Sequence, residues 1–543
     1  MRHNGLVITD FEKRHTIVII GGGPGGYEAA LAGAQLGANV TLIEQSGVGG
    51  SAVLTDVVPS KTLIATADAA NSISEATELG IRLEQDGRAV KPSVTIDLKA
   101  VNHRLLELAA TQSADMRENL IAAGVRIISG RGRLDGNHAV LVDGFDAIPS
   151  ERIKAQTIVI AVGAYPRRLP SAMPDGERIF TWTQLYDLTE LPEHLIVIGS
   201  GVTGAEFASA YLALGSKVTL ISSRDTVLPG EDKDAAEVIE TVFRRNGMQI
   251  LSRSRAESVR NTGDGVEVTL SDGKVLHGSH CLMAVGSIPN TADIGLEEAG
   301  IELTATGHIS VNKVARTSRA NVYAVGDCTD FFPLASVASM QGRTAVFHAM
   351  GDISLPTQLR NVSSNVFTSP EIASVGWPQL AIENDTVQGD IHKIMLHNNP
   401  RAKMQGIDDG FIKLFARTGS GTVGVVTTGG VTGSDTVGTL EQPASNRIRP
   451  PKAHNLLITI LVCVIIMFIF TAGVAHAVTC ICPAHCTSSS MRKLAQLPIV
   501  LATAFAAIAL HAPASAQVEG LARDYLEIRI RHYHHRLDRQ LGL

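Results

Sequence analysis

The chain has 543 residues, more than one hydrophobic core can serve, so we expect about three domains. A formal net charge of -6 and a pI near 6.3 give no overall basic surface. This excludes nucleic acid as a partner of the whole chain and favours a small ligand. The body of the chain contains only Cys281 and Cys328, so it has no disulfide framework and is predicted to be cytoplasmic. We expect no N-terminal targeting signal, because residues 1–14 are mostly polar.

Two units of the chain have the same order of strand, glycine-rich turn and helix. The first has an apolar strand from Thr16 to Ile20 and a helix from Tyr27 to Gly37. The second repeats it about one domain length later, with a strand from Leu195 to Ile198 and a helix from Ala205 to Leu214. Apolar strands that lead through glycine turns into helices are typical of parallel sheets. The pattern predicts an α/β fold.

Further elements fill the space around these units. We expect a long helix from Ala100 to Ala123, a strand from Arg126 to Ser129 and a buried strand from Thr157 to Val162. Short strands and turns return from Val266 to Asn312. The stretch from Asn321 to Asp327 is predicted to be a strand that ends in an acid and, with a helix after it, to form a third unit.

The first glycine turn has the features of a dinucleotide site. Gly21, Gly23 and Gly26 lie between the strand and the helix, and Glu44 follows the next strand, Val40 to Ile43. The glycines let the backbone approach a pyrophosphate at the helix N-terminus, and the carboxylate can bind both hydroxyls of an adenosine ribose.

The second glycine turn has the same spacing but a different partner. The next strand, Lys217 to Ile221, is followed by Ser222 and Arg224 in place of an acid. A missing carboxylate and a nearby arginine favour a 2′-phosphate and hence NADPH, although NADH stays open. The glycines of this turn are Gly199, Gly201 and Gly204.

Two dinucleotide sites in one chain imply hydride transfer between a nicotinamide and a flavin. Short motifs in the right order then carry a resemblance to the flavoprotein disulfide reductases, such as lipoamide dehydrogenase, over about residues 14–428. The resemblance implies that the chain binds FAD together with NADPH or NADH. The motifs are residues 21–28, 49–61 (Gly-Gly-Ser-Ala-Val-Leu-Thr-Asp-Val-Val-Pro-Ser-Lys), 161–164, 285–291 and 323–327.

The same resemblance assigns roles to individual residues. It implies that Lys61 lies at flavin N5 and pairs with Glu206, so these two are the candidate catalytic residues. It also implies that Asp327 holds the ribityl chain of the flavin. No metal site is predicted. The other candidates for cofactor binding within these motifs are Gly50, Gly163 and Gly286.

Positions 52 and 57 depart from the family pattern. Family members carry a cysteine at each position, and this chain has Ala52 and Val57, with the spacing from Gly49 to Lys61 intact. Neither side chain can form a thiolate or a disulfide, so dithiol chemistry is excluded at the usual site. The segment is similar to that of the lipoamide-dehydrogenase-like NAD(P)H quinone reductases. We therefore predict an enzyme that passes hydride from NAD(P)H through FAD to a quinone-like acceptor.

Two other functions stay open at this point. Pyridine nucleotide transhydrogenase activity also needs no dithiol. The chain could instead be a truncated or fused flavoprotein without activity, because the family pattern ends near Gly429 and half of the interface domain is missing. Members of the family form homodimers, and this loss leaves dimer formation in doubt.

The C-terminal tail differs in character from the body. Residues 456–478 contain no charged side chain and are long enough to cross a bilayer as a helix. Arg447, Arg449 and Lys452 would place the N-terminal side of this helix in the cytoplasm, so that the tail tethers a cytoplasmic body to the membrane. Residues 491–516 resemble a secretory signal peptide with its cleavage site. A fusion or frameshift of the coding sequence explains this layout better than a two-helix anchor.

The sequence therefore predicts two Rossmann-like dinucleotide-binding domains, a truncated α+β interface domain and an unrelated apolar tail. The predicted segments are the FAD-binding domain in two parts (14–165 and 285–354), the NAD(P)H-binding domain (166–284), the partial interface domain (355–428), a linker (429–455), the transmembrane helix (456–478), a signal-peptide-like or second apolar segment (491–516) and a basic tail (517–543).

Overall fold

The structure is a computed structural model, and it describes residues 14–428 except 86–87, 91–93, 146–149, 353–355, 357 and 419–422. The chain divides into two compact units, Met1–Arg449 and Pro450–Leu543, and all described residues belong to the first. Within the described residues, no helix is both long enough and apolar enough to cross a bilayer. The segments predicted at 429–455, 456–478, 491–516 and 517–543 lie outside the described residues.

The first sheet has seven strands in the order β19-β8-β1-β2-β5-β6-β7. Its strand β1 (Thr16–Ile20) lies between β8 (Thr157–Ile160) and β2 (Asn39–Glu44) and is parallel to both. The side chains of Ile17 to Ile20 are buried because both faces of the sheet are covered, which is why the strand is a continuous apolar run. The other strands are β19 (Val322–Ala324) and β5 (Arg126–Leu134), which are parallel to their neighbours β8 and β2, and β6 (Ala139–Gly144) and β7 (Glu151–Lys154), which are antiparallel.

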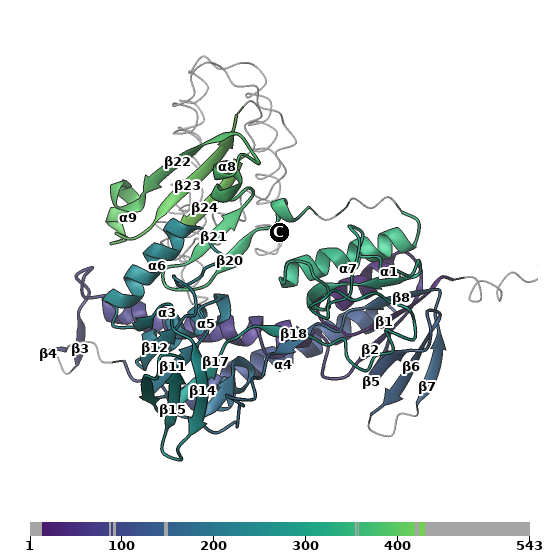
Figure 1. Ribbon diagram of the computed structural model, residues 1–543, viewed down its shortest axis with the longest axis horizontal. Helices are drawn as coiled ribbons and strands as arrows, with labels where there is room; N and C mark the ends of the chain where they lie inside the picture. The colour runs from purple at the N-terminus through teal and green to yellow at the C-terminus, as the bar shows by residue number, and fades with distance from the viewer. Residues whose placement is uncertain are drawn as a thin grey trace, which may run out of the picture. The chain divides into compact units, whose positions relative to one another are not determined.

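Two helices pack together on one face of this sheet, α1 (Pro24–Gln35) and α7 (Ala335–Ala349) (Figure 1). They approach so closely that a Cβ atom on Gly342 of α7 would lie 2.1 Å from the carbonyl oxygen of Gly25. Helix α1 begins earlier than the expected Tyr27, because Pro24 occupies the first turn, where its missing N–H costs nothing.

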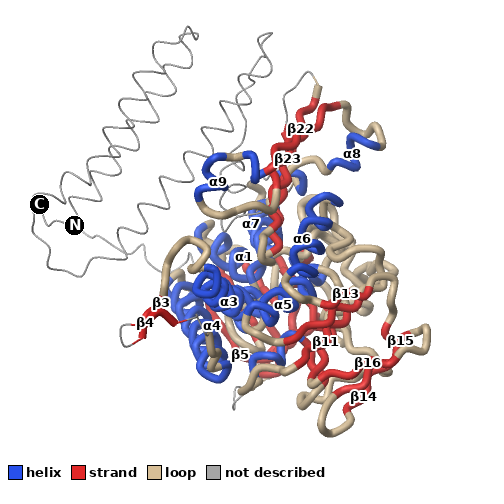
Figure 2. The backbone as a smooth tube through the Cα atoms, turned by 90° about the vertical axis from the view of Figure 1, so that its left-hand side faces the viewer, coloured by secondary structure: helices blue, strands red, loops and turns tan. Residues whose placement is uncertain are grey.

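The second sheet repeats the plan of the first with five parallel strands in the order β10-β17-β11-β12-β13. Its middle strand β11 (His194–Ile198) leads into α5 (Val202–Ala213) as β1 leads into α1. The remaining elements are β10 (Ile179–Thr181), β12 (Lys217–Ile221), β13 (Gln249–Leu251), β17 (His280–Met283) and α6 (Lys233–Arg245), and the small antiparallel sheet in Figure 2 consists of β14 (Ala256–Asn261), β15 (Val266–Leu270) and β16 (Val275–Gly278).

Strands β9 (Ala164–Pro166) and β18 (Ser287–Pro289) pair with each other at the places where the chain leaves the first sheet and returns to it. After β2 the chain forms the helices α2 (Gly50–Leu54), α3 (Val57–Glu75) and α4 (Leu98–Ala122). The short strands β3 (Leu83–Gln85) and β4 (Arg88–Val90) lie between α3 and α4 in the sequence. The 3-10 helices are η2 (Trp182–Asp187), η3 (Gly326–Cys328), η4 (Leu359–Asn361) and η5 (Leu396–Asn398).

The third sheet is antiparallel and has the strand order β20-β21-β24-β23-β22. A buried ion pair joins it to the second sheet's layer, because Lys413 Nζ of β23 lies 2.7 Å from Asp232 Oδ1 at the N-terminus of α6. The elements of this part are β20 (Ser364–Val366), β21 (Ile372–Val375), β22 (Gly389–Met395), β23 (Phe411–Arg417) and β24 (Val423–Thr428), with α8 (Gln379–Glu383) and α9 (Pro400–Met404).

Candidate functional site

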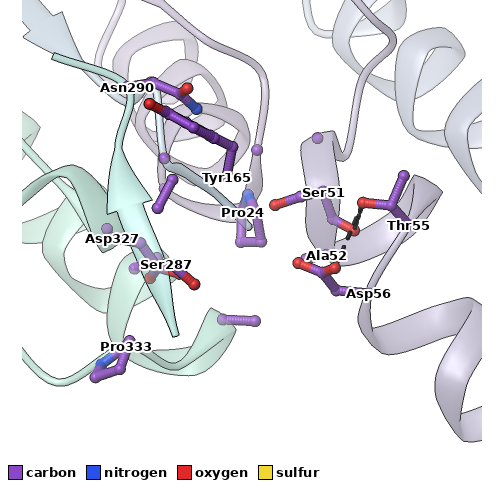
Figure 3. Close-up of a pocket in the computed structure, with 18 of the residues that line it drawn as sticks. Pro24, Ser51, Ala52, Thr55, Asp56, Tyr165, Ser287, Asn290, Asp327 and Pro333 are labelled. Atoms are coloured by element: carbon purple, nitrogen blue, oxygen red, sulfur yellow. Dashed lines mark hydrogen bonds between the residues drawn. The ribbon is translucent and has the colours of Figure 1, made fainter. Parts of the chain in front are cut away.

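A cavity of about 1060 Å³ is lined by residues from all five motifs on which the resemblance rests. Its lining does not include the predicted residues of the second dinucleotide site, which are Gly199, Gly201, Gly204, Ser222 and Arg224. Its walls come from the first glycine turn, from α2 and the start of α3, from β9 and β18, and from the first turn of α5. Figure 3 shows Asp56, Thr55 and Ala52 on one side of this space and Tyr165, Ser287 and Asp327 on the other. A cavity of this size can hold an extended cofactor rather than a single small substrate.

The three glycines of the first turn meet three different requirements. Gly21 has a φ of +100°, and a Cβ atom there would lie 2.3 Å from the carbonyl oxygen of Ala161. A Cβ atom on Gly26 would lie 1.9 Å from the carbonyl oxygen of Gly21. At Gly23, by contrast, a Cβ atom would meet no protein atom within 4 Å. Gly23 caps α1 without a side-chain hydrogen bond, so the helix N-terminus is open for an anion such as a pyrophosphate.

Glu44 lies at the end of β2 beside this turn, and its carboxylate is held in place by backbone N–H groups. Gly22 N donates to Oε2, and Ser46 N donates to Oε1 at 2.7 Å. Oε1 also accepts a hydrogen bond of 3.2 Å from Gly47 N, so Oε2 is the oxygen that keeps further acceptor capacity. Because Glu44 borders the cavity, it is pre-positioned to accept a hydrogen bond from a ribose hydroxyl.

The second glycine turn reproduces the geometry of the first. A Cβ atom on Gly199 (φ +112°) would lie 2.1 Å from the carbonyl oxygen of Ala284, and one on Gly204 would lie 1.9 Å from that of Gly199. Gly201 caps α5 and is as open as Gly23. The N-termini of α1 and α5 thus both allow close approach of a phosphate group.

The two residues predicted to select the nicotinamide cofactor lie in different surroundings. Ser222 is fully buried, and its hydroxyl lies 2.7 Å from Ser200 Oγ and bonds the backbone of Arg224. The hydrogen bonds of Ser222 therefore stabilise the loop after β12 from its buried side. Arg224 is exposed, as is Ser223, which the sequence analysis did not single out. Only these two side chains of the loop's Ser-Ser-Arg run face the surface.

Lys61 of α3 and Glu206 of α5 form the expected ion pair, with Lys61 Nζ 2.7 Å from Glu206 Oε2. Glu206 is almost fully buried, with 5% of its side chain exposed, and its other oxygen accepts a hydrogen bond of 2.9 Å from Phe367 N. Lys61 Nζ also lies 4.7 Å from the centre of the Phe367 ring. The pair is therefore held by contacts from three separate parts of the chain, and Lys61 borders the cavity.

Ala52 and Val57 both line the cavity, on the same wall as Lys61. Within the described residues, the free cysteines are Cys281 and Cys328, and both are fully buried. Burial raises the pKa of the Cys328 thiol to about 12 and also raises the pKa of Cys281. Neither of these two thiols can form a thiolate at neutral pH.

Asp327 lies in η3 on the opposite wall, and the neighbouring Gly326 N donates to Gln341 Oε1 of α7 at 2.8 Å. Burial raises the pKa of Asp327, and the negative charge of Asp56 raises it further. The remaining motif glycines have positive φ angles and lie in or beside the cavity wall, at Gly50 (φ +56°), Gly163 (φ +64°) and Gly286 (φ +89°), the last preceding Ser287.

Two further residues of the cavity wall were missed by sequence reasoning. Asp56 caps α3, and its Oδ1 accepts a hydrogen bond of 2.7 Å from Trp182 Nε1. An acid between the two positions that carry cysteine in the family was a signal that could have been found. Trp182 offered none, because it is 126 residues away in the sequence.

Comparison with known proteins agrees with this geometry. The model of the pyridine nucleotide-disulphide oxidoreductases matches residues 15–342, more than half of the chain. The chain belongs to the pyridine nucleotide-disulphide oxidoreductase family. This family binds FAD and NAD(P)H, so the chain is a flavoprotein oxidoreductase with two dinucleotide cofactors. The model of the family's dimerisation domain matches residues 362–449 and extends past residue 428, where the sequence analysis placed the end of the interface domain.

Relatives within the family carry two kinds of name. An NAD(P)H dehydrogenase (quinone) of Mycobacterium tuberculosis is 48% identical over 416 residues, which is 75% of this chain and 83% of the relative. A dihydrolipoyl dehydrogenase of Zymomonas mobilis is 32% identical over 75% of this chain and 86% of its own length.

Solved structures also match the chain. LpdA from M. tuberculosis matches with 45% identity and a TM-score of 0.75, over 80% of this chain and 94% of that one. The HOCl-induced flavoprotein disulfide reductase RclA from Escherichia coli matches with 25% identity and a TM-score of 0.68, over 81% of this chain and 97% of that one.

Proposed function

We propose that the chain is an NAD(P)H dehydrogenase that reduces a quinone-like acceptor and uses no redox-active disulfide. The observation that carries this proposal is the cavity wall where Ala52 and Val57 lie beside the ion pair of Lys61 and Glu206. A wall without sulfur cannot store electrons as a dithiol, so the acceptor must take them from the flavin itself. The printed name of the M. tuberculosis relative supports the same acceptor class.

The cofactor assignment follows from the two open glycine turns. We assign residues 14–165 and 285–354 to FAD binding, with Gly21, Gly23 and Gly26 at the pyrophosphate and Glu44 at the ribose. Residues 166–284 are assigned to NAD(P)H, with the turn of Gly199, Gly201 and Gly204 at its pyrophosphate and exposed Arg224 toward a 2′-phosphate. When bound, FAD supplies the two-electron carrier between nicotinamide and acceptor.

Lys61 is proposed to act as a fixed positive charge in the cavity. Its side chain is 30% exposed, and its ammonium group is oriented by buried Glu206 and by the Phe367 ring. A cation held in this way stabilises negative charge that develops next to it without having to reorganise. Ala52 and Val57 contribute small apolar side chains, which leave room for a flat aromatic acceptor.

The oligomeric state and the membrane contact of the chain are also proposals. The match to the dimerisation-domain model supports a homodimer. Membrane contact through the tail depends on residues 456–478, which lie outside the described residues.

Steady-state oxidation of NADPH by the purified protein, with menadione and with lipoamide as alternative acceptors, tests the proposal. We expect a yellow protein that reduces menadione and leaves lipoamide oxidised. A colourless protein that releases no flavin on heating, or the absence of menadione reduction, would refute the proposal. Hydride transfer from NADPH to an NAD analogue without menadione reduction would replace it by transhydrogenase activity.

A further inference from the structure

Asp56 places a carboxyl group in the cavity, and the proposed function gives this group no role. It caps α3, between Ala52 and Lys61, and lines the same wall as both. Figure 3 shows its carboxyl group directed toward the space that separates it from Ser287 and Asp327. The cap is made without a side-chain hydrogen bond to the helix, so helix formation does not require this carboxyl group.

The proposed reaction leaves a proton unaccounted for. Reduction of a quinone to a hydroquinone takes two electrons and two protons. A hydride brings both electrons and one of the protons, so the second proton must come from an acid within reach of a quinone oxygen. We propose, as an extension of the proposed function, that Asp56 is this acid. Its O–H bond breaks as the new O–H bond forms on the quinone oxygen, and the carboxylate then takes a proton from solvent.

The surroundings of Asp56 favour its protonated form. Burial raises the pKa of Asp56, and this effect exceeds the opposing hydrogen bonds from Trp182, Ser51 and Thr55 and the charge of Lys61. A carboxyl group that keeps its proton toward neutral pH is suited to act as a general acid.

The other groups that face Asp56 are less suited to the task. Lys61, on the same helix, is held by Glu206 of α5. Asp327 of η3 is the residue proposed to hold the ribityl chain. Tyr186 of η2 has a buried hydroxyl, and burial followed by the charge of Asp56 raises its pKa beyond the useful range. Trp182 Nε1 donates only to Asp56 in the described residues, and its indole N–H is too weak an acid to give up its proton near neutral pH.

The substitution Asp56→Asn tests the inference because asparagine keeps an oxygen for Trp182 Nε1 and is also a good helix cap. Asp68→Asn is the matched control: burial also raises the pKa of Asp68 on the same helix, and Asp68 does not line the cavity. Each holoenzyme is reduced with NADPH and mixed in a stopped-flow instrument with menadione, or with ferricyanide, which accepts electrons without protons. Infrared pH titration of the oxidised flavoproteins reports the protonated carboxyl group independently of turnover.

We expect Asp56→Asn to slow reoxidation by menadione by about 100-fold or more and to leave reoxidation by ferricyanide unchanged. The wild-type menadione rate should fall as pH rises through the pKa of Asp56, and the variant rate should not depend on pH in this range. The infrared titration should lose one protonated-carboxyl component in Asp56→Asn relative to the wild type, and Asp68→Asn should retain that component.

Three results would overturn the inference: an unchanged menadione rate in Asp56→Asn, an equal slowing of both acceptors, or an infrared titration in which Asp56→Asn retains every carboxyl component of the wild type. Failure of the proposed function is distinguishable from these, because the wild-type protein itself would then not reduce menadione.

Discussion

The two open glycines allow the assignment of cofactors to turns to be tested by a reciprocal pair of substitutions, Gly23→Ala and Gly201→Ala. Each glycine has a negative φ, and a Cβ atom added to either meets no protein atom within 4 Å. Alanine is therefore accepted by the folded protein without strain, and any loss of binding reports on the ligand.

The size of the effect follows from what the methyl group displaces. At Gly201 it would stand between the N-terminus of α5 and the pyrophosphate of NAD(P)H. Loss of one hydrogen bond to a charged group costs about 1.5–3 kcal/mol, which corresponds to a roughly 10- to 100-fold rise in Kd for NADPH. At Gly23 the same displacement would weaken FAD binding at α1 by a similar factor.

Stopped-flow reduction of the flavin by NADPH measures the change in Kd for NADPH in Gly201→Ala. The flavin content of the purified protein measures the loss of FAD binding in Gly23→Ala. We expect Gly201→Ala to retain its flavin and raise the Kd for NADPH, and Gly23→Ala to lose flavin. Each variant serves as the control for the other. A Gly201→Ala protein with wild-type affinity for NADPH, or one that loses flavin instead, would show that the assignment of the turns is wrong.

Three further predictions address other parts of the structure. Trp182→Phe removes a hydrogen bond that lowers the pKa of Asp56, so the fall of the menadione rate should move to higher pH; a shift to lower pH would contradict the reasoning. Lys413→Met leaves buried Asp232 without its cation and should lower the free energy of unfolding by about 3–5 kcal/mol. The control Lys393→Met removes an ion pair that is about one-third exposed and should lower it by about 0–1 kcal/mol. Equal midpoints of urea unfolding for the two variants would contradict this difference. Arg224→Gln should weaken binding of NADPH and spare NADH, with exposed Arg253→Gln as the control, and loss of both cofactors alike would exclude 2′-phosphate recognition.

Much of the fold could be predicted because its strands and glycine turns have local sequence patterns. The strands Thr16–Ile20 and Lys217–Ile221 have the predicted bounds, since buried parallel strands are apolar runs that end at a turn. Strand β5 extends to Leu134, well beyond the predicted Ser129, because its second half pairs with β6. Strand β6 follows after residues 135–138 only, but the alternation of small and charged residues in this half of β5 does not indicate that it continues as a strand.

The candidate site divides in the same way. Its glycine turns could be predicted, because close approach and an open helix N-terminus each require glycine at a fixed spacing. The burial of Ser222 could not, since it depends on contacts with Ser200 and with the loop that follows. The hydrogen bond between Asp56 and Trp182 likewise joins segments that only the folded chain brings together. Contacts between residues that are far apart in the sequence therefore produce no regular spacing from which they could be predicted.

Anaerobic reductive titration tests the central claim most directly, because it counts the electrons that the protein can hold. A flavoprotein without a redox-active disulfide takes up one two-electron equivalent of NADPH per flavin, and a reducible disulfide takes up a second. We predict that the flavin is fully bleached at one equivalent and that no further NADPH is consumed. Consumption of two equivalents per flavin would contradict the account.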